Sequence, residues 1–293
     1  MKNNQLMIYG AYGYAGELMV REAVAQGLRP IIAGRDDEKL KPIATELSLE
    51  CRAFGVRNTG SNLQDISVLL NCAGPFSATA EPLARACLAQ QIHYLDITGE
   101  IDIFRKCHAL DEEARQQNVL ILPGAGTDIV PTDCLAAMLK EKLPVATRID
   151  LALSFGTNPS IGTVNTMIES FGKGGLIREG GMLKVVSNAF QMRKIPFQNK
   201  PQWAMTIPWG DVFTSGISTG VPDGAVYVAM PRMSIYMIRL TNPVKGILNT
   251  QFGQKITKRL AGWLMKKGPD AKALEAGRGQ FWGEAEAPDG EKL

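Results

Sequence analysis

Histidine and cysteine are scarce in this sequence, and their scarcity excludes several kinds of chemistry. Only two histidines and five cysteines occur among 293 residues. The cysteines form no CxxC pair and no cluster with histidine at the spacing of metal ligands. The sequence therefore predicts reduced thiols and no metal site.

Two familiar catalytic signatures are also missing. No tyrosine is followed four residues later by lysine, so the YxxxK pair of short-chain dehydrogenases is absent. The phosphate-binding GxxxxGK motif is absent too. A cysteine thioester route needs an activated thiol with a histidine partner. His93 precedes an expected strand and His108 lies in an expected helix, so structural roles are expected for both, and Cys134 is expected to be a buried thiol.

Strong charge imbalance and long apolar runs are lacking as well. The net charge is +3, and lysine and arginine do not cluster, so nucleic acid is not predicted as a partner. No apolar run approaches the roughly 20 residues that span a bilayer, which argues against stable membrane insertion. The N-terminal residues lack the features of a signal peptide. A cytoplasmic location is therefore expected.

The sequence does contain short apolar runs that alternate with helical patterns over its first 125 or so residues. This alternation is typical of βαβ units around a parallel sheet. Helices are expected at 16–25, 36–47, 81–91 and 103–117, the second of them capped by Asp36 or Asp37. Six strands are expected, and they predict a doubly wound Rossmann sheet: Leu6–Tyr9, Pro30–Ala33, about Cys51–Val56, Val68–Cys72, Tyr94–Ile97 and Val119–Leu122.

Beyond Gly126 the pattern changes, and a second domain with α+β structure is expected. The predicted division is 1–128 for the dinucleotide-binding domain and 129–293 for a substrate and dimerisation domain. The second domain is expected to contain a helix at 132–143, a strand at 148–155 and an amphipathic basic helix at 256–267. The last residues predict a strand that enters a turn, so the chain is expected to be truncated at its C-terminus.

Three glycines mark the end of the first strand. Gly10, Gly13 and Gly16 have the spacing GxxGxxG between the strand and an expected helix. Glycine permits positive φ, and a helix N-terminus favours a bound phosphate. The spacing departs from the GxGxxG dinucleotide fingerprint, so a purely structural turn remains an alternative.

The end of the second strand indicates which dinucleotide is bound. An acidic residue about 20 residues beyond the glycines binds the ribose of NAD, whereas arginine accepts the 2′-phosphate of NADP. Here Gly34 is expected to leave room for that phosphate, and Arg35 supplies the charge. Asp36 could serve an NAD ribose or cap a helix. The sequence favours NADP.

Three further turns follow expected strands, namely NCAGPF at 71–76, DITGE at 96–100 and PGAGTDIVPTD at 123–133. Ligands of such sheets bind at the carboxyl ends of the strands. We therefore expect the four turns to form one cofactor site. Glu100 and Asp128 are candidate proton donors there, with helix capping or turn stabilisation as the alternative.

This ordered set of motifs resembles the NADP-binding domain of the saccharopine dehydrogenase-like oxidoreductases, a group that includes trans-acting enoyl reductases. The resemblance covers about the first 135 residues. It implies a Rossmann domain, a second α/β domain and reduced NADP as the hydride source. It also implies a role for three sets of residues. The pyrophosphate would be held by Gly10, Tyr12, Gly13, Tyr14, Ala15 and Gly16, and the 2′-phosphate by Arg35. The nicotinamide side would be held by Cys72, Ala73, Gly74 and Pro75.

The sequence thus predicts an NADP(H)-dependent oxidoreductase that acts on a small-molecule substrate and is a candidate homodimer. Imine reduction and enoyl reduction both remain open for its reaction. A sensor or scaffold that binds the cofactor without turnover is the alternative from another class, because no acid and base pair can be identified.

Overall fold

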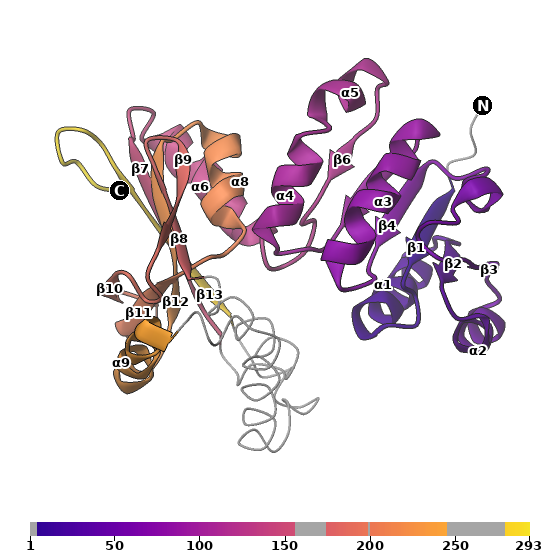
Figure 1. The fold of residues 1–293 in the computed structure, drawn as a ribbon, viewed down its shortest axis with the longest axis horizontal. Coiled ribbons are helices and arrows are strands. Elements are labelled where there is room, and N and C mark those ends of the chain that lie inside the picture. The colour runs from indigo at the N-terminus through magenta and orange to yellow at the C-terminus, as the bar shows by residue number, and fades with distance from the viewer. Residues whose placement is uncertain (1–4, 156–173, 199, 245–278) are drawn as a thin grey trace. The chain divides into compact units, whose positions relative to one another are not determined.

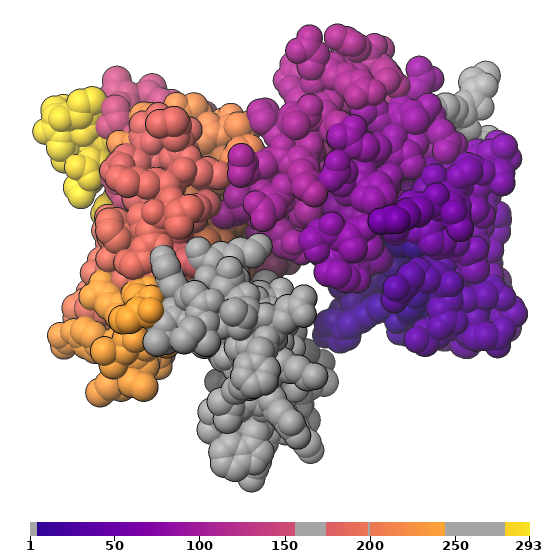
Figure 2. Space-filling view, in the orientation of Figure 1, coloured from indigo at the N-terminus to yellow at the C-terminus, as the bar shows by residue number. Residues whose placement is uncertain are grey.

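The protein was analysed as a computed structural model, which describes residues 5–155, 174–198, 200–244 and 279–293. The chain divides into two compact units, Met1–Val130 and Pro131–Leu293 (Figure 1). In the space-filling view the N-terminal unit forms one continuous body, coloured indigo to magenta (Figure 2). Each unit has its own sheet, so each is described by itself.

The N-terminal unit is built on a parallel sheet with the strand order β3-β2-β1-β4-β5-β6. This is the order of the doubly wound dinucleotide-binding fold, so the predicted Rossmann class is confirmed. Strand β1 is central, and the connections reverse direction beside it, between β1 and β4. The six strands are β1 (Leu6–Tyr9), β2 (Ile31–Gly34), β3 (Cys51–Ala53), β4 (Val68–Asn71), β5 (His93–Asp96) and β6 (Ile121–Leu122).

Helices cover both faces of this sheet, and side chains of β1 alternate between the two cores. Met7 and Tyr9 belong to one core, while Ile8 belongs to the other. The first core takes residues from α3 and α4, and the second takes residues from α1 and α2. The helices and the short 3-10 turn of this unit are α1 (Tyr14–Ala25), α2 (Asp37–Leu47), η1 (Gly60–Leu63), α3 (Phe76–Ala89), α4 (Ile101–His108) and α5 (Asp111–Gln116).

The prediction of a single helix at 103–117 is wrong, because the structure divides this segment into α4 and α5. The division falls at Ala109 and Leu110, and the Leu110 side chain is buried in the core. The residues that follow, Asp111, Glu112 and Glu113, are all acidic. Negative charge is favourable in the first turn of a helix, so this run starts a new helix instead of continuing the old one.

The second unit contains a mixed sheet with the order β10-β11-β12-β7-β13, which confirms the predicted α+β class. Strands β7 and β12 pair in parallel, whereas β13 joins β7 antiparallel. Strand β8 pairs with β12 and β9 away from this path. The strands are β7 (Arg148–Ser154), β8 (Gly175–Glu179), β9 (Met182–Val186), β10 (Met192–Ile195), β11 (Gln202–Ile207), β12 (Asp223–Ala229) and β13 (Gln280–Glu286).

Three helices and one 3-10 turn complete the described part of this unit, namely α6 (Val130–Lys142), α8 (Asp211–Thr219), α9 (Arg232–Leu240) and η2 (Asn242–Val244). The buried guanidinium of Arg178 on β8 donates to the carbonyl oxygens of Val212 and Val221. The amphipathic helix predicted at 256–267 lies outside the described residues. Within the described ranges, no helix is both long enough and apolar enough to cross a membrane.

Candidate functional site

The turn after β1 has the geometry of a phosphate-binding loop. Gly10 adopts a φ of +85°, and its amide donates to the Ala33 carbonyl of β2 at 2.7 Å. The Gly10 carbonyl then accepts from the Gly13 amide at 2.9 Å, which closes the turn. Gly13 is the N-cap of α1 and has no side chain that could cap the helix. The first turn of α1, from Tyr14 onward, is the kind of helix N-terminus that accepts a phosphate.

Close packing explains why two of these positions are glycine. A Cβ on Gly16 would stand 2.1 Å from the Gly10 carbonyl oxygen, so no other residue fits this backbone. A Cβ on Gly10 would stand 2.7 Å from the Ala73 amide nitrogen, in the turn after β4. The first and fourth strands therefore end in turns that touch. The structure brings together the glycine loop and the predicted nicotinamide-side turn.

The turn after β2 differs from the expectation in one respect. A Cβ on Gly34 would stand 2.6 Å from Cε1 of Tyr12, so the tyrosine ring occupies the space next to Gly34. Gly34 thus makes room for Tyr12, a residue of the glycine loop, and not only for a phosphate. Arg35 follows with an exposed side chain. Asp36 caps α2, because its Oδ1 accepts from the Lys39 amide at 3.3 Å.

The turn after β4 is fixed by hydrogen bonds with the side chains of Asn71, which is buried, and Thr79, which is partly buried. The Ala73 amide donates to Oδ1 of Asn71 at 3.0 Å, and the Ala73 carbonyl accepts from Oγ1 of Thr79 at 2.6 Å. Gly74 and Pro75 are exposed, and Pro75 is the N-cap of α3. Cys72 is buried, and desolvation, with the nearby charge of Asp96 as a smaller cause, raises the pKa of its thiol to about 12. Cys72 is therefore no candidate for a thiolate nucleophile.

A buried polar network links this turn to the two that follow. The Tyr94 hydroxyl accepts from Nδ2 of Asn71 at 3.1 Å and donates to Oδ2 of Asp96 at 2.8 Å. Oδ1 of Asp96 accepts from the amides of Thr98 at 3.0 Å and Gly124 at 2.9 Å. Burial raises the pKa of the Asp96 carboxyl, and these donors oppose the rise. The network joins the ends of β4, β5 and β6 at one edge of the sheet.

The predicted site residues do not include the three members of this network, Asn71, Tyr94 and Asp96. Tyr94 and Asp96 stand two apart on a strand and so point to the same face. The shared face of Tyr94 and Asp96 could be predicted from this spacing, but their contact with Asn71 on the neighbouring strand could not.

The two predicted proton donors lie in neighbouring turns. Glu100 is the N-cap of α4, and its side chain makes no capping hydrogen bond. A Cβ on Gly99 would lie 3.6 Å from Oδ2 of Asp128, so the Asp128 carboxylate borders the DITGE turn. Asp128 retains surface exposure, yet the surrounding chain desolvates its carboxyl enough to raise the pKa.

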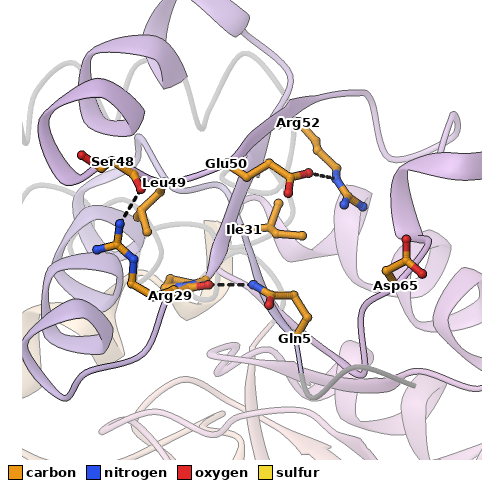
Figure 3. Close-up of a pocket in the computed structure, with 9 residues that line it drawn as sticks. Gln5, Arg29, Ile31, Ser48, Leu49, Glu50, Arg52 and Asp65 are labelled. Atoms are coloured by element: carbon orange, nitrogen blue, oxygen red, sulfur yellow. Dashed lines mark hydrogen bonds and ion pairs between the residues drawn. The ribbon is translucent and has the colours of Figure 1, made fainter. Parts of the chain in front are cut away.

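A pocket of about 380 Å³ lies at the amino edge of the parallel sheet, opposite the edge that carries the glycine loop (Figure 3). Its walls come from residues that precede β1, β2, β3 and β4, which is the amino edge of the strands. Its polar groups bond to one another: Gln5 donates to the Arg29 carbonyl at 2.6 Å, and Arg52 pairs with Glu50 at 2.8 Å. We therefore do not assign the cofactor to this pocket, because dinucleotides bind at the carboxyl edge.

Other residues that carry familiar chemistry have structural partners. Nδ1 of His93 accepts from the Leu120 amide at 2.9 Å. A GxSxG pattern at 216–220 lies at the end of α8, where Ser218 donates to Asp133 at 2.6 Å. A nucleophile elbow needs a strand-to-helix turn, so this serine does not form one. In the described part of the chain, no three histidine, cysteine or acidic residues are grouped as metal ligands.

Comparison with known families agrees with this geometry. Residues 6–122 match the family described as the saccharopine dehydrogenase NADP binding domain. The matched residues lie within the N-terminal unit, which is therefore similar to the saccharopine dehydrogenase NADP binding domain. The resemblance noted in the sequence is thereby confirmed.

Similar proteins carry related names. The saccharopine dehydrogenase-like oxidoreductases of rat and human are each 25% identical, over 231 and 233 residues, and each match covers 69% of this chain. A Mycobacterium tuberculosis protein named for trans-acting enoyl reductase activity is 28% identical over 205 residues, which is 63% of this chain and 44% of that protein. This chain spans about half the length of the rat and human relatives, with 53% of each covered.

One solved structure shares the fold over most of the chain. Saccharopine dehydrogenase (L-Glu forming) from Saccharomyces cerevisiae aligns with a TM-score of 0.61 at 9% identity. The alignment covers 82% of this chain and 57% of the yeast chain. At this identity the likeness concerns the fold alone.

Proposed function

We propose that this protein is an NADP(H)-dependent oxidoreductase that transfers a hydride to or from a small or acyl substrate. The observation that carries the proposal is the meeting of the glycine loop with the Ala73 turn at the carboxyl edge of the sheet. That edge is where nucleotides bind in doubly wound sheets. The matching NADP binding domain supports the same cofactor.

The residues at this edge fit a dinucleotide. The Gly10 turn is a cradle that a Cβ would fill, and the first turn of α1 is open to a pyrophosphate because its N-cap is glycine. Arg35 has the charge and the exposure to accept a 2′-phosphate. The full proposed set is Gly10, Tyr12, Gly13, Tyr14, Ala15, Gly16, Arg35, Cys72, Ala73, Gly74 and Pro75.

When bound, the nicotinamide of NADP carries the hydride, so the protein must supply orientation and a proton. We propose Asp128 and Glu100 as the groups that hold this proton. Desolvation by the surrounding chain raises the pKa of Asp128, which keeps its carboxyl protonated to a higher pH than an ordinary aspartate. Replacement of each acid by its amide tests the pair: Asp128→Asn and Glu100→Gln should slow NADPH oxidation without weakening NADPH binding.

We propose that the second unit forms the substrate pocket; residues 156–173 and 245–278 of this unit lie outside the described residues. Imine and enoyl compounds are the two classes to test, in a panel with NADPH as the hydride source. Relatives carry names that place them in mitochondria or at lipid droplets, so the cytoplasm remains a prediction for this protein. A homodimer likewise remains a prediction.

Titration with NADPH and NADH, followed by cofactor fluorescence, tests the proposal directly. The wild-type protein should bind NADPH at micromolar concentration and prefer it to NADH. Arg35→Ala should weaken NADPH by about tenfold or more and leave NADH almost unchanged, because only NADPH has the 2′-phosphate. Arg115→Ala, at an exposed arginine of α5 that pairs with Asp111, is the matched control. Equal loss for both cofactors would overturn the 2′-phosphate assignment, and a folded protein that binds neither would overturn the function.

A further inference from the structure

Asp36 stands near the position where an NAD-specific site would have its acidic residue, two residues after Gly34 ends β2. Two contacts already engage its carboxylate. Oδ1 accepts from the Lys39 amide at 3.3 Å, and Oδ2 lies 3.3 Å from Nζ of Lys39 in an ion pair. One residue, Lys39, thus supplies both partners, one from its backbone and one from its side chain.

Tyr12 defines the other side of this arrangement. Its ring packs against Gly34, and Nζ of Lys39 lies 5.6 Å from the centre of that ring. A cation at this distance from an aromatic face is attracted to it. The lysine ammonium is therefore held between the glycine loop and the Asp36 carboxylate, beside the strand end that precedes Arg35.

We propose that Lys39 determines the choice of cofactor by neutralising Asp36. The inference rests on the proposed function, because it concerns the same ribose end of the dinucleotide. An ionised Asp36 without its lysine would repel the 2′-phosphate of NADP and would be available to a ribose hydroxyl of NAD. With Lys39 in place, Asp36 keeps its capping role, and its negative charge is offset.

The effect of Lys39 and Asp36 on cofactor choice can be measured separately from their effect on protein stability. The Lys39 and Asp36 side chains are 65% and 39% exposed, so their ion pair contributes little to folding. Lys39→Gln keeps the backbone amide that donates to Asp36. Asp36→Asn keeps a side-chain oxygen for the cap, because asparagine is as good an N-cap as aspartate. Both substitutions therefore change charge and preserve the helix.

A double-mutant cycle with NADPH and NADH as the probes tests the proposal. Lys39→Gln should weaken NADPH by about fivefold, the scale of an interaction between exposed charges, without weakening NADH. In the Asp36→Asn background, the same Lys39→Gln change should have almost no effect on NADPH. Equal loss of NADPH in the two backgrounds would overturn the proposal, because Lys39 would then act without Asp36.

Lys41→Gln is the matched control for the loss of one positive charge. Lys41 lies on the same helix and pairs with Asp37 at 2.7 Å and Glu38 at 2.9 Å. It should leave the ratio of NADPH to NADH affinity unchanged. If Lys41→Gln alters the ratio as much as Lys39→Gln does, the effect is one of net charge, and the proposal fails.

Arg35→Ala separates this proposal from the proposed function. If that variant keeps the preference for NADPH, the 2′-phosphate assignment itself is wrong. If it abolishes the preference while Lys39→Gln does not change it, the assignment stands and only the role of Lys39 is overturned.

Discussion

The α-carbon of Gly10 lies so close to Ala73 that a Cβ on the glycine would be 2.7 Å from the Ala73 amide nitrogen. This contact joins the turns that follow the two central strands, β1 and β4, which pair in parallel from Leu6 to Tyr9. Gly10 also has a φ of +85°, a conformation that side chains disfavour. Two independent requirements therefore fix glycine at this position.

Gly10→Ala should impair both folding and cofactor binding. The positive φ alone costs about 1 to 2 kcal/mol of unfolding free energy with a side chain present. The clash with Ala73 adds to this and shifts amides of the loop, so NADPH affinity should fall by about tenfold or more. Urea unfolding and NADPH titration measure the two effects.

Gly27→Ala is the control for that experiment. Gly27 has a similar φ of +81°, but a Cβ there would meet nothing within 4 Å. It should lose stability from the backbone alone and retain NADPH binding. If both variants lost the cofactor equally, the contact with Ala73 would have no special role in the site.

Tyr94→Phe should destabilise the N-terminal unit and loosen the three turns that the network joins. The change removes the hydroxyl between Asn71 and Asp96 while keeping the ring. The buried Oδ2 of Asp96 then loses its hydroxyl donor, which costs about 1 to 3 kcal/mol. Urea unfolding should show a fall of that size in the unfolding free energy, and a lower midpoint. Tyr14→Phe, at a tyrosine that is 75% exposed, should leave the midpoint unchanged.

The pH dependence of stability should carry a contribution from Asp96. Its pKa in the folded protein is raised above the ordinary 3.8, so the folded state binds a proton at pH values where the unfolded chain has lost it. Stability from this group therefore falls as pH rises from about 3.8 through the raised pKa. Above that pKa the destabilisation is complete.

Urea unfolding of wild-type protein and Asp96→Asn between pH 3.5 and pH 7, taken as about the range of carboxyl titration, isolates this contribution. The difference in unfolding free energy between the two proteins should shift in favour of the variant as pH rises. A difference that moved in the opposite direction would show that hydrogen bonds to Asp96 outweigh its burial.

Thiol reactivity should divide the cysteines by burial. The prediction that Cys134 is buried is wrong: Cys134 is exposed, and it should react with iodoacetamide in the folded protein. Cys72, Cys87 and Cys107 are buried, and desolvation raises the pKa of each thiol to about 12, so they should react only after unfolding. Peptide mass spectrometry measures the labelling at each site. Rapid labelling of Cys72 in the native state would reopen a nucleophilic role.

The class of the fold and the positions of the turns could be predicted from the amino-acid sequence alone. Alternating apolar and helical patterns are local properties, and they predicted the strands of the parallel sheet and its glycine turns. The strand order then follows the common rule for such units. The division of 103–117 into two helices was not predicted: the acidic run at 111–113 is visible in the sequence, but the burial of Leu110 beside it depends on packing in the core.

Which of these turns touch, and which side chains contact one another, depends on how the strands and helices pack. Gly34 accommodates the ring of Tyr12, and Asn71 meets Tyr94 across neighbouring strands, 23 residues apart in the sequence. Periodicity shows which face a residue occupies but not which distant residue faces it. Strand order and close backbone packing determine which distant residues meet, and they give the glycine turn its geometry.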